Sequence, residues 1–350
     1  MSVTTVTTAP AAVSAPPRRR SRPRRVVWLI VLALLVLAAS IVSVTFGTRA
    51  VTFDDIVAGL SGSIESTSAA AVTKRVPRTV LALVVGAALA VSGAVMQGVT
   101  RNPLADPQIL GINGGASLAV VIGLAFFGVT GAFGYIWLAM LGAAIAAVFV
   151  YTIGSLGRGG ASPLKLALAG AATAVAFSSL ISAILLPRID VMSVFRFWQI
   201  GGVGGATVEK ILLVLPFLAV GMVICLAASA ALNSLALGDE LAAGLGERVR
   251  TVRLIAALGA VILCGAATAV AGPIGFVGLI VPHICRLLVG PDHRWLLPVS
   301  ALVGGGLLIV ADVVGRVIAR PQEVEVGIVT ALIGAPFFIA IVRRQKMRAL

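Results

Sequence analysis

The chain has 350 residues, of which 59% are hydrophobic (AVILMFWYC) and only 11% are charged, and its mean hydropathy is +1.09. Soluble domains are about 25% charged, so this chain has too few charges to cover a surface that faces water. The composition excludes a soluble enzyme, a disordered scaffold and a collagen-like protein, and it makes membrane lipid the main surroundings of the chain. The net charge of +14 does not indicate nucleic-acid binding, because the basic residues are grouped in short segments between long apolar runs.

Residues 1–25 precede the first apolar run. Their first half is polar and rich in proline, and the basic sequence RRRSRPRR follows it. We interpret this segment as a disordered basic cytoplasmic tail that leads into a retained first helix. A signal peptide with residues 26–39 as its apolar region is the alternative. The apolar run continues to about Phe46 without a clear A-x-A cleavage site, which favours the retained helix.

The rest of the chain, residues 26–348, is predicted to be an all-α polytopic membrane domain. A helix needs about 20 apolar residues to cross the hydrocarbon core, and ten segments approach this length. Because ten is even, both termini lie on the same side of the membrane. With cytoplasmic termini, the cytoplasmic segments hold 18 Lys and Arg and the outer segments hold 9, as the positive-inside rule requires. The predicted spans are residues 27–46, 77–98, 110–128, 133–154, 163–186, 210–231, 252–271, 274–290, 296–318 and 327–343.

Two short segments resemble each other. GAALAVSG (Gly86–Gly93) and GAATAVAG (Gly265–Gly272) match at six of eight positions. They lie in the second and seventh predicted spans, which cross the membrane in opposite directions. This pattern predicts an inverted repeat with spans 2–5 and 7–10 as its halves, which is typical of transporters.

The sequence offers little for catalysis. It contains no G-x-x-x-x-G-K-[ST] motif, so we expect no ATP site of the Walker A type in this chain. The two histidines, His283 and His293, have no carboxylates around them at metal-binding spacing. Cys225, Cys264 and Cys285 lie in apolar stretches and are interpreted as small buried hydrophobic residues. We therefore predict no catalytic, cofactor or metal site, and no enzyme.

One acidic residue lies within a predicted span. Asp312 precedes Arg316 by four residues, so the two side chains share one face of a helix. We interpret them as an intrahelical ion pair near the outer end of span 9. A proton relay in an ion-coupled secondary transporter is one alternative, and a role for Arg316 in an outer docking surface is another.

Residues 233–250, NSLALGDELAAGLGERVR, are too polar to span the membrane. Leu237, Leu241, Leu245 and Val249 recur every four residues, which predicts one apolar stripe along a short helix. A helix that lies on the lipid head groups is the alternative, but such helices are usually basic on their polar face. The mixed charges here favour a surface helix that contacts a protein.

Four ordered segments resemble a known family. They are RVPRTVLALVVGAALAVSGAVMQGVTRNPLADPQILGINGGA (Arg75–Ala116), LALGDELAAGLG (Leu235–Gly246), GPIGFVGLIVPHICRLLVGPDHRWLLPVS (Gly272–Ser300) and VEVGIVTALIGAPFFIAIV (Val324–Val342). They look like the FecCD-type permeases, the membrane subunits of ABC importers for iron-siderophores, heme and vitamin B12. The resemblance extends from about residue 27 to residue 348 and implies the architecture of a type II ABC importer permease.

The resemblance also implies partners. Members of the family pair with a second permease subunit as homodimers or heterodimers, and they take substrate from an extracytoplasmic binding protein. Two separate ATPase subunits bind ATP and Mg²⁺, so this chain needs no cofactor of its own. The implied function is import of a metal chelate across the cell membrane. A ferric siderophore is the first choice, and heme or vitamin B12 is the alternative.

The resemblance assigns two sets of residues. The first is expected to couple the chain to the ATPase, and the second to dock the binding protein. One departure is visible, because Glu325 stands where many members have proline, and we expect a local difference at the start of the last span. The coupling residues are Leu237, Gly238, Asp239, Glu240, Leu245 and Gly246, and the docking residues are Arg75, Arg78, Arg316 and Arg320.

Overall fold

The computed structural model describes residues 22–49, 51–62, 66–129, 131–156 and 163–346, and most of the predicted tail lies outside them. The described residues form helices and connecting turns, without a strand. Seven helices are long and apolar enough to cross a membrane. They are α1 (Arg22–Thr45), α3 (Thr67–Thr100), α5 (Ala132–Ser155), α6 (Pro163–Leu185), α8 (Val208–Ala227), α11 (Val249–Ala271) and α13 (His293–Ile318).

Three further predicted spans form shorter apolar helices. They are α4 (Ile112–Phe126), α12 (Val277–Val289) and α14 (Val326–Lys346). Every predicted span therefore coincides with a helix, although α1 begins at Arg22, inside the segment assigned to the tail. Short helices outside the predicted spans complete the chain. They are α2 (Phe53–Ser61), η1 (Pro107–Leu110), α7 (Ile189–Ile200), α9 (Ser229–Leu235) and α10 (Asp239–Gly244).

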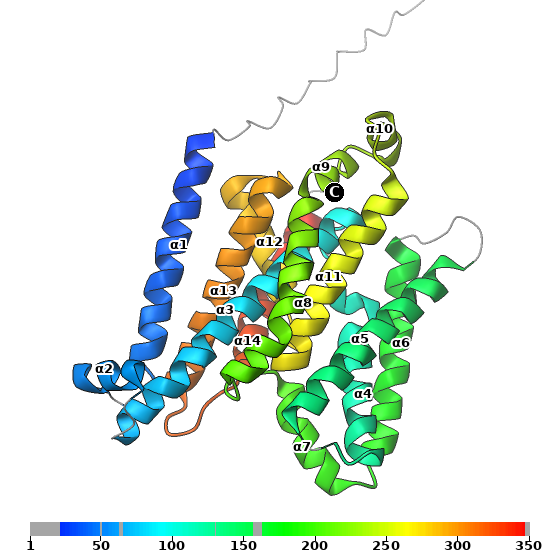
Figure 1. Ribbon diagram of the computed structural model, residues 1–350. Helices are drawn as coiled ribbons and strands as arrows, with labels where there is room; N and C mark the ends of the chain where they lie inside the picture. The colour runs from blue at the N-terminus through cyan, green and yellow to red at the C-terminus, as the bar shows by residue number, and fades with distance from the viewer. Residues whose placement is uncertain (1–21, 50, 63–65, 130, 157–162, 347–350) are drawn as a thin grey trace, which may run out of the picture.

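The helices form one bundle with two distinct ends (Figure 1). The start of α1, α9 and α10 lie at one end, which we call the α10 end. The helices α2 and α7 lie at the opposite end, which we call the α7 end. Helix α1 starts at the α10 end and α14 runs toward it, as an even number of crossings requires.

Helix α3 is the central helix, and small residues let its neighbours approach closely. A Cβ atom on Gly86 would collide with the backbone of Gly304 in α13, and one on Gly93 would collide with Gly278 in α12. Lipid supplies no hydrophobic drive between helices, so contacts of this kind hold a membrane bundle together. The most apolar part of α3 is 78% buried, whereas that of α1 is 11% buried. Helix α1 therefore faces mainly lipid.

The predicted inverted repeat is confirmed by the direction and the packing of its halves. Helix α3 runs from the α7 end to the α10 end, and α11 runs the opposite way (Figure 1). Gly86 of α3 packs on α13, and the matching Gly265 of α11 packs on Ala143 of α5. Since α5 and α13 hold equivalent positions in the two halves, the same helix contact occurs twice in opposite orientations.

Candidate functional sites at the two ends of the bundle

At the α10 end, residues 233–250 do not form the single helix that the sequence predicts. They contribute the end of α9, the six residues of α10 and the start of α11. Gly238 separates α9 from α10 with φ +116°, and Gly246 follows α10 with φ +89°. Residues with a Cβ atom rarely adopt positive φ, so glycines at these two positions divide the segment. The prediction of one continuous apolar stripe was wrong for this reason.

The leucines of this segment nevertheless form an exposed patch. Leu237, Leu241 and Leu245 are 59%, 62% and 66% exposed, whereas Val249 packs partly against the core. Helix α10 projects beyond the ends of α8 and α11 (Figure 1). Exposed apolar residues grouped on a projection are typical of a surface that contacts a protein.

The opposite side of α10 is fixed to the bundle. Ala242 is fully buried, and Asp239 forms ion pairs with Arg101 and with Arg253, the latter at 2.9 Å between Oδ1 and Nη2. Glu240 is exposed. Of the predicted coupling residues, Leu237, Glu240 and Leu245 are therefore available to a partner. Asp239 joins α10 to its own chain, and the two glycines shape the turns.

Sequence reasoning missed a polar junction beneath this projection. Asn233 of α9 donates from Nδ2 to Asp292 Oδ1 at 2.7 Å, and its Oδ1 accepts the backbone N–H of His293 at 2.9 Å. Asp292 also pairs with Arg25 of α1 at 3.2 Å. Burial pushes the pKa of Asp292 upward, but hydrogen bonds from Asn233 and the Arg294 N–H, with the charge of Arg25, hold it below its usual value. The junction ties α9 to the start of α13.

At the α7 end, a buried charge cluster joins α3 to α13. Arg78 of α3 donates to Asp312 Oδ1 from Nε at 2.8 Å and pairs with it through Nη2 at 2.7 Å. Arg316 Nη2 lies 2.9 Å from Asp312 Oδ2, an ion pair that lacks hydrogen-bond geometry. Arg78 Nη1 reaches Glu323 Oε2 at 2.6 Å. The structure thus contains the predicted Asp312–Arg316 pair and adds Arg78 and Glu323 to it.

The same contacts show where the arginines of the predicted docking surface lie. Arg75, Arg78 and Arg316 are 5%, 9% and 2% exposed. Arg75 donates to the carbonyls of Thr45 and Arg49 at 3.0 and 2.9 Å, and Arg316 donates to Ser43. These carbonyls belong to the last turn of α1 and to the residues after it. The last carbonyls of a helix have no backbone N–H group of the same helix to bind, so the arginines supply the missing donors. Three of the four predicted docking arginines therefore lie inside the bundle.

Other basic residues are exposed at the α7 end. Arg320 is exposed, although its Nη2 also donates to the Gly47 carbonyl at 2.5 Å. Arg49, Lys74 and Arg196 are exposed as well. A partner that approached this end would meet these four side chains rather than the buried cluster.

The departure at Glu325 has a local consequence. Its side chain is half-buried against Gly202, and burial raises its pKa. Backbone N–H groups of the next turn donate to its carbonyl, and α14 begins at the following residue. The last span therefore starts normally without the proline.

Together, the two ends describe a polytopic helical membrane protein built as an inverted repeat, with a projection that carries exposed leucines at one end. Among the described residues, no group of three or more His, Cys, Asp or Glu could hold a metal ion. An inverted repeat of membrane-spanning helices is typical of membrane transporters, and this is the class of protein that the fold indicates.

Comparisons with known proteins define the family. The model of the FecCD transport family matches residues 32–344, so the chain belongs to this family. Ferric enterobactin transport system permease protein FepD of Escherichia coli is 44% identical over 315 residues, which are 90% of this chain and 94% of FepD. YfiZ of Bacillus subtilis, named a probable siderophore transport system permease protein, is 41% identical, over 91% of this chain and 96% of YfiZ.

Permeases for cobalamin and for hemin are also among the relatives. A solved structure of an inward-facing metal-chelate type ABC transporter is 30% identical to this chain. It superposes with a TM-score of 0.79 over 91% of this chain and 99% of that one. The predicted fold and family are therefore confirmed.

Proposed function

We propose that this chain is the membrane-spanning permease subunit of an ATP-driven importer for a metal chelate. The observation that carries the proposal is the exposed leucine patch on α10, in a chain of the FecCD transport family. The patch would bind an ATPase subunit, and ATP and Mg²⁺ would bind there rather than to this chain. The α10 end would then face the cytoplasm with both termini, and the protein would lie in the cell membrane.

At the opposite end, the partner would be an extracytoplasmic binding protein. The buried positions of Arg75, Arg78 and Arg316 favour a structural role for them. The exposed cations Arg49, Lys74, Arg196 and Arg320 would instead meet acidic residues on the binding protein. This attraction would weaken at high salt, because exposed charges are screened.

A second permease subunit would complete the pathway. Helix α6 has little of its surface buried in this chain, and Ala171, Ser178 and Ser182 are exposed along one of its faces. Small residues on an uncovered span favour close contact with another helix. The substrate would pass along this subunit interface.

The substrate class rests on the relatives. FepD and YfiZ, the two relatives described above, are named for ferric enterobactin and for a siderophore. We therefore propose a ferric siderophore, with heme or cobalamin as the alternatives of the same type.

The coupling assignment is tested by the proteins that co-purify with this chain in mild detergent. The wild type should retain a Walker-motif ATPase in stoichiometric amount. Leu241→Asp with Leu245→Asp should lose it, because the exposed patch becomes charged. Phe53→Asp, which alters a residue that is 77% exposed at the α7 end, is the matched control and should keep the ATPase.

Uptake supplies the second readout. Asp239→Lys with Glu240→Lys should abolish uptake while the chain stays in the membrane. Unchanged uptake would remove the coupling assignment. A chain that purifies alone and transports in liposomes without ATP would instead support an ion-coupled transporter.

A further inference from the structure

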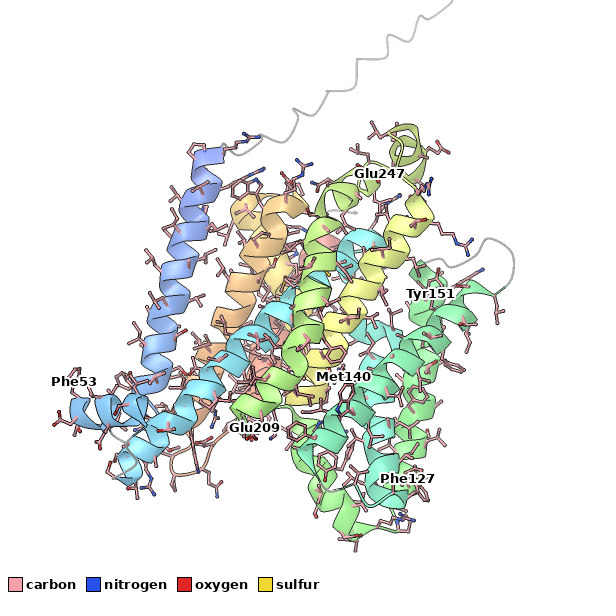
Figure 2. All side chains as sticks on the ribbon, in the orientation of Figure 1. Phe53, Phe127, Met140, Tyr151, Glu209 and Glu247 are labelled. Carbon is pink, nitrogen blue, oxygen red and sulfur yellow. The ribbon has the colours of Figure 1, made fainter. Side chains whose placement is uncertain are left out.

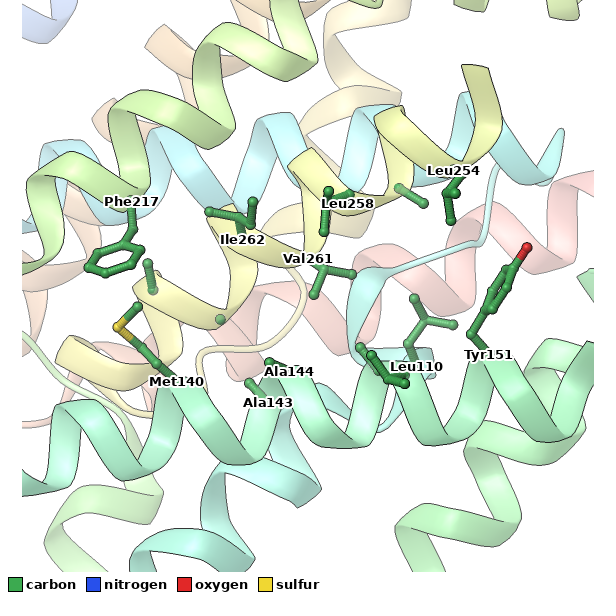
Figure 3. A pocket seen from close by; sticks show the side chains of 15 residues that line it. Leu110, Met140, Ala143, Ala144, Tyr151, Phe217, Leu254, Leu258, Val261 and Ile262 are labelled. Carbon is green, nitrogen blue, oxygen red and sulfur yellow. The ribbon is translucent and has the colours of Figure 1, made fainter. Parts of the chain in front are cut away.

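An apolar groove runs along the side of the bundle between α5 and α11 (Figure 3). We call it the α5–α11 groove. Its volume is about 460 Å³, and Phe217 of α8 lines it beside Met140. Met140 and Tyr151 mark its extent on α5, and Leu254 and Ala266 mark it on α11. The lining is almost entirely hydrocarbon, so water is a poor occupant of the groove.

The groove opens sideways, toward the lipid. Val148, Leu254 and Leu258 line it and are 66%, 52% and 53% exposed. From Leu254 to Ala266, α11 rises about 18 Å at 1.5 Å per residue. One leaflet of the hydrocarbon core is about 15 Å deep. The groove therefore has the length of a single acyl chain, and it extends inward from the α10 end.

Polar groups lie at the α10 end of the groove. Tyr151 and Leu254 lie together at this end (Figure 3). Arg250 lies one helical turn before Leu254 and therefore on the same face of α11. It is exposed, and within the part of the chain that the structure describes, no hydrogen bond or ion pair engages it.

Two acidic residues before the start of α11 have other partners. Asp239 pairs with Arg101 and Arg253, and Glu247 accepts a hydrogen bond from Ser234. Arg250 is thus a cation with no carboxylate bound to it, one helical turn beyond the end of the groove that Leu254 and Tyr151 mark. Basic residues beside helix grooves are typical binding groups for anionic lipid head groups.

We propose that the α5–α11 groove binds an anionic phospholipid. One acyl chain fills the groove, and Arg250 and the Tyr151 hydroxyl hold the phosphate at the α10 end. Because α5 belongs to one half of the inverted repeat and α11 to the other, the bound lipid stabilises the contact between the halves. This site does not depend on the ATPase or on the transported substrate.

Native mass spectrometry tests the site on the full chain in detergent. The delipidated protein is mixed with equal amounts of phosphatidylglycerol and phosphatidylcholine. The wild type should retain several-fold more phosphatidylglycerol, and Arg250→Gln should remove this preference. Arg294→Gln is the matched control, because Arg294 is also exposed at the α10 end but belongs to α13, and it should behave like the wild type.

The acyl position is tested separately with a phosphatidylglycerol that carries a photoreactive group in its acyl chain. Cross-links should concentrate on 140–151 and 254–266. Ala144→Trp, which fills the groove from an exposed position on α5, should reduce them several-fold. Thiol protection of the buried Cys225, Cys264 and Cys285 verifies that each variant is folded.

Three results would overturn the proposal. Cross-links spread equally over lipid-facing helices such as α1 would show that the groove is not selective. Equal retention of both lipids would remove the role of Arg250. Cross-links between two copies of this chain across α5 and α11, with lipid excluded, would identify a protein as the occupant.

Discussion

Replacing Asp312 by asparagine should destabilise the protein strongly. Asp312 is 1% exposed and is the only carboxylate that contacts both Arg78 and Arg316 among the described residues. Asparagine keeps the shape and one hydrogen-bond acceptor but removes the charge. Two buried guanidinium groups would then lack their common counter-ion, and breaking a buried ion pair in this way costs about 3–5 kcal/mol.

Glu323→Gln is the matched control. This substitution also replaces a carboxylate that pairs with Arg78 by an amide. Unlike Asp312, however, the Glu323 side chain is 36% exposed. An exposed ion pair contributes roughly 0–1 kcal/mol. The two variants therefore differ mainly in the burial of the lost charge.

A thiol-reactive fluorescent dye measures the difference, because all three cysteines are buried and react only when the bundle opens. By the scaling for soluble domains, ~2 °C per kcal/mol, Asp312→Asn should lower the apparent Tm by about 6–10 °C. Glu323→Gln should lower it by about 2 °C or less. Equal shifts for the two variants would refute the view that burial determines the cost. Transport by Asp312→Asn at full rate with the proton gradient collapsed would also exclude Asp312 as a proton relay.

Two further predictions concern helix packing and pH. Gly86→Ala should lower the apparent Tm by several degrees, because the added Cβ atom would collide with the backbone of Gly304. Gly131→Ala is the control and should leave the Tm unchanged, because no atom lies within 4 Å of the added Cβ. Asp292 has a lowered pKa, so its stabilising effect is complete above its ordinary pKa of 3.8 and is lost as the pH falls through the folded value. Tryptophan fluorescence melts should therefore show a constant gap between wild type and Asp292→Asn at neutral pH and a shrinking gap below about pH 4. A gap that is unchanged at low pH would show that Asp292 does not act through its charge.

The positions of the spans could be predicted from the sequence because they depend on local composition. A run of about 20 apolar residues must cross the bilayer wherever its neighbours lie. The direction of each span follows from counting crossings. The similar segments Gly86–Gly93 and Gly265–Gly272 lie in spans that run in opposite directions, and they therefore predicted the inverted repeat. The i, i+4 spacing of Asp312 and Arg316 likewise predicted their ion pair, since one helix brings them together.

The candidate sites depended on contacts that no local pattern encodes. Arg78 and Asp312 are 234 positions apart in the chain. From its sequence neighbours alone, Arg78 was therefore predicted to be an exposed cation, whereas in the structure it is buried. Figure 2 shows the side chains that fill the bundle. A glycine at position 238 permits positive φ but does not require it, so the break between α9 and α10 was not predictable either.

The sequence by itself determined that the chain is a membrane protein with ten apolar spans, in which direction each span runs relative to the others, and which family it resembles. Only the tertiary structure decided which arginines are buried, where α10 projects, and that α5 and α11 leave a groove between them. The physical reason is the range of the interactions. Whether a segment is stable in lipid depends on the composition of that segment alone. Ion pairs and grooves, in contrast, form between segments that are distant in the sequence.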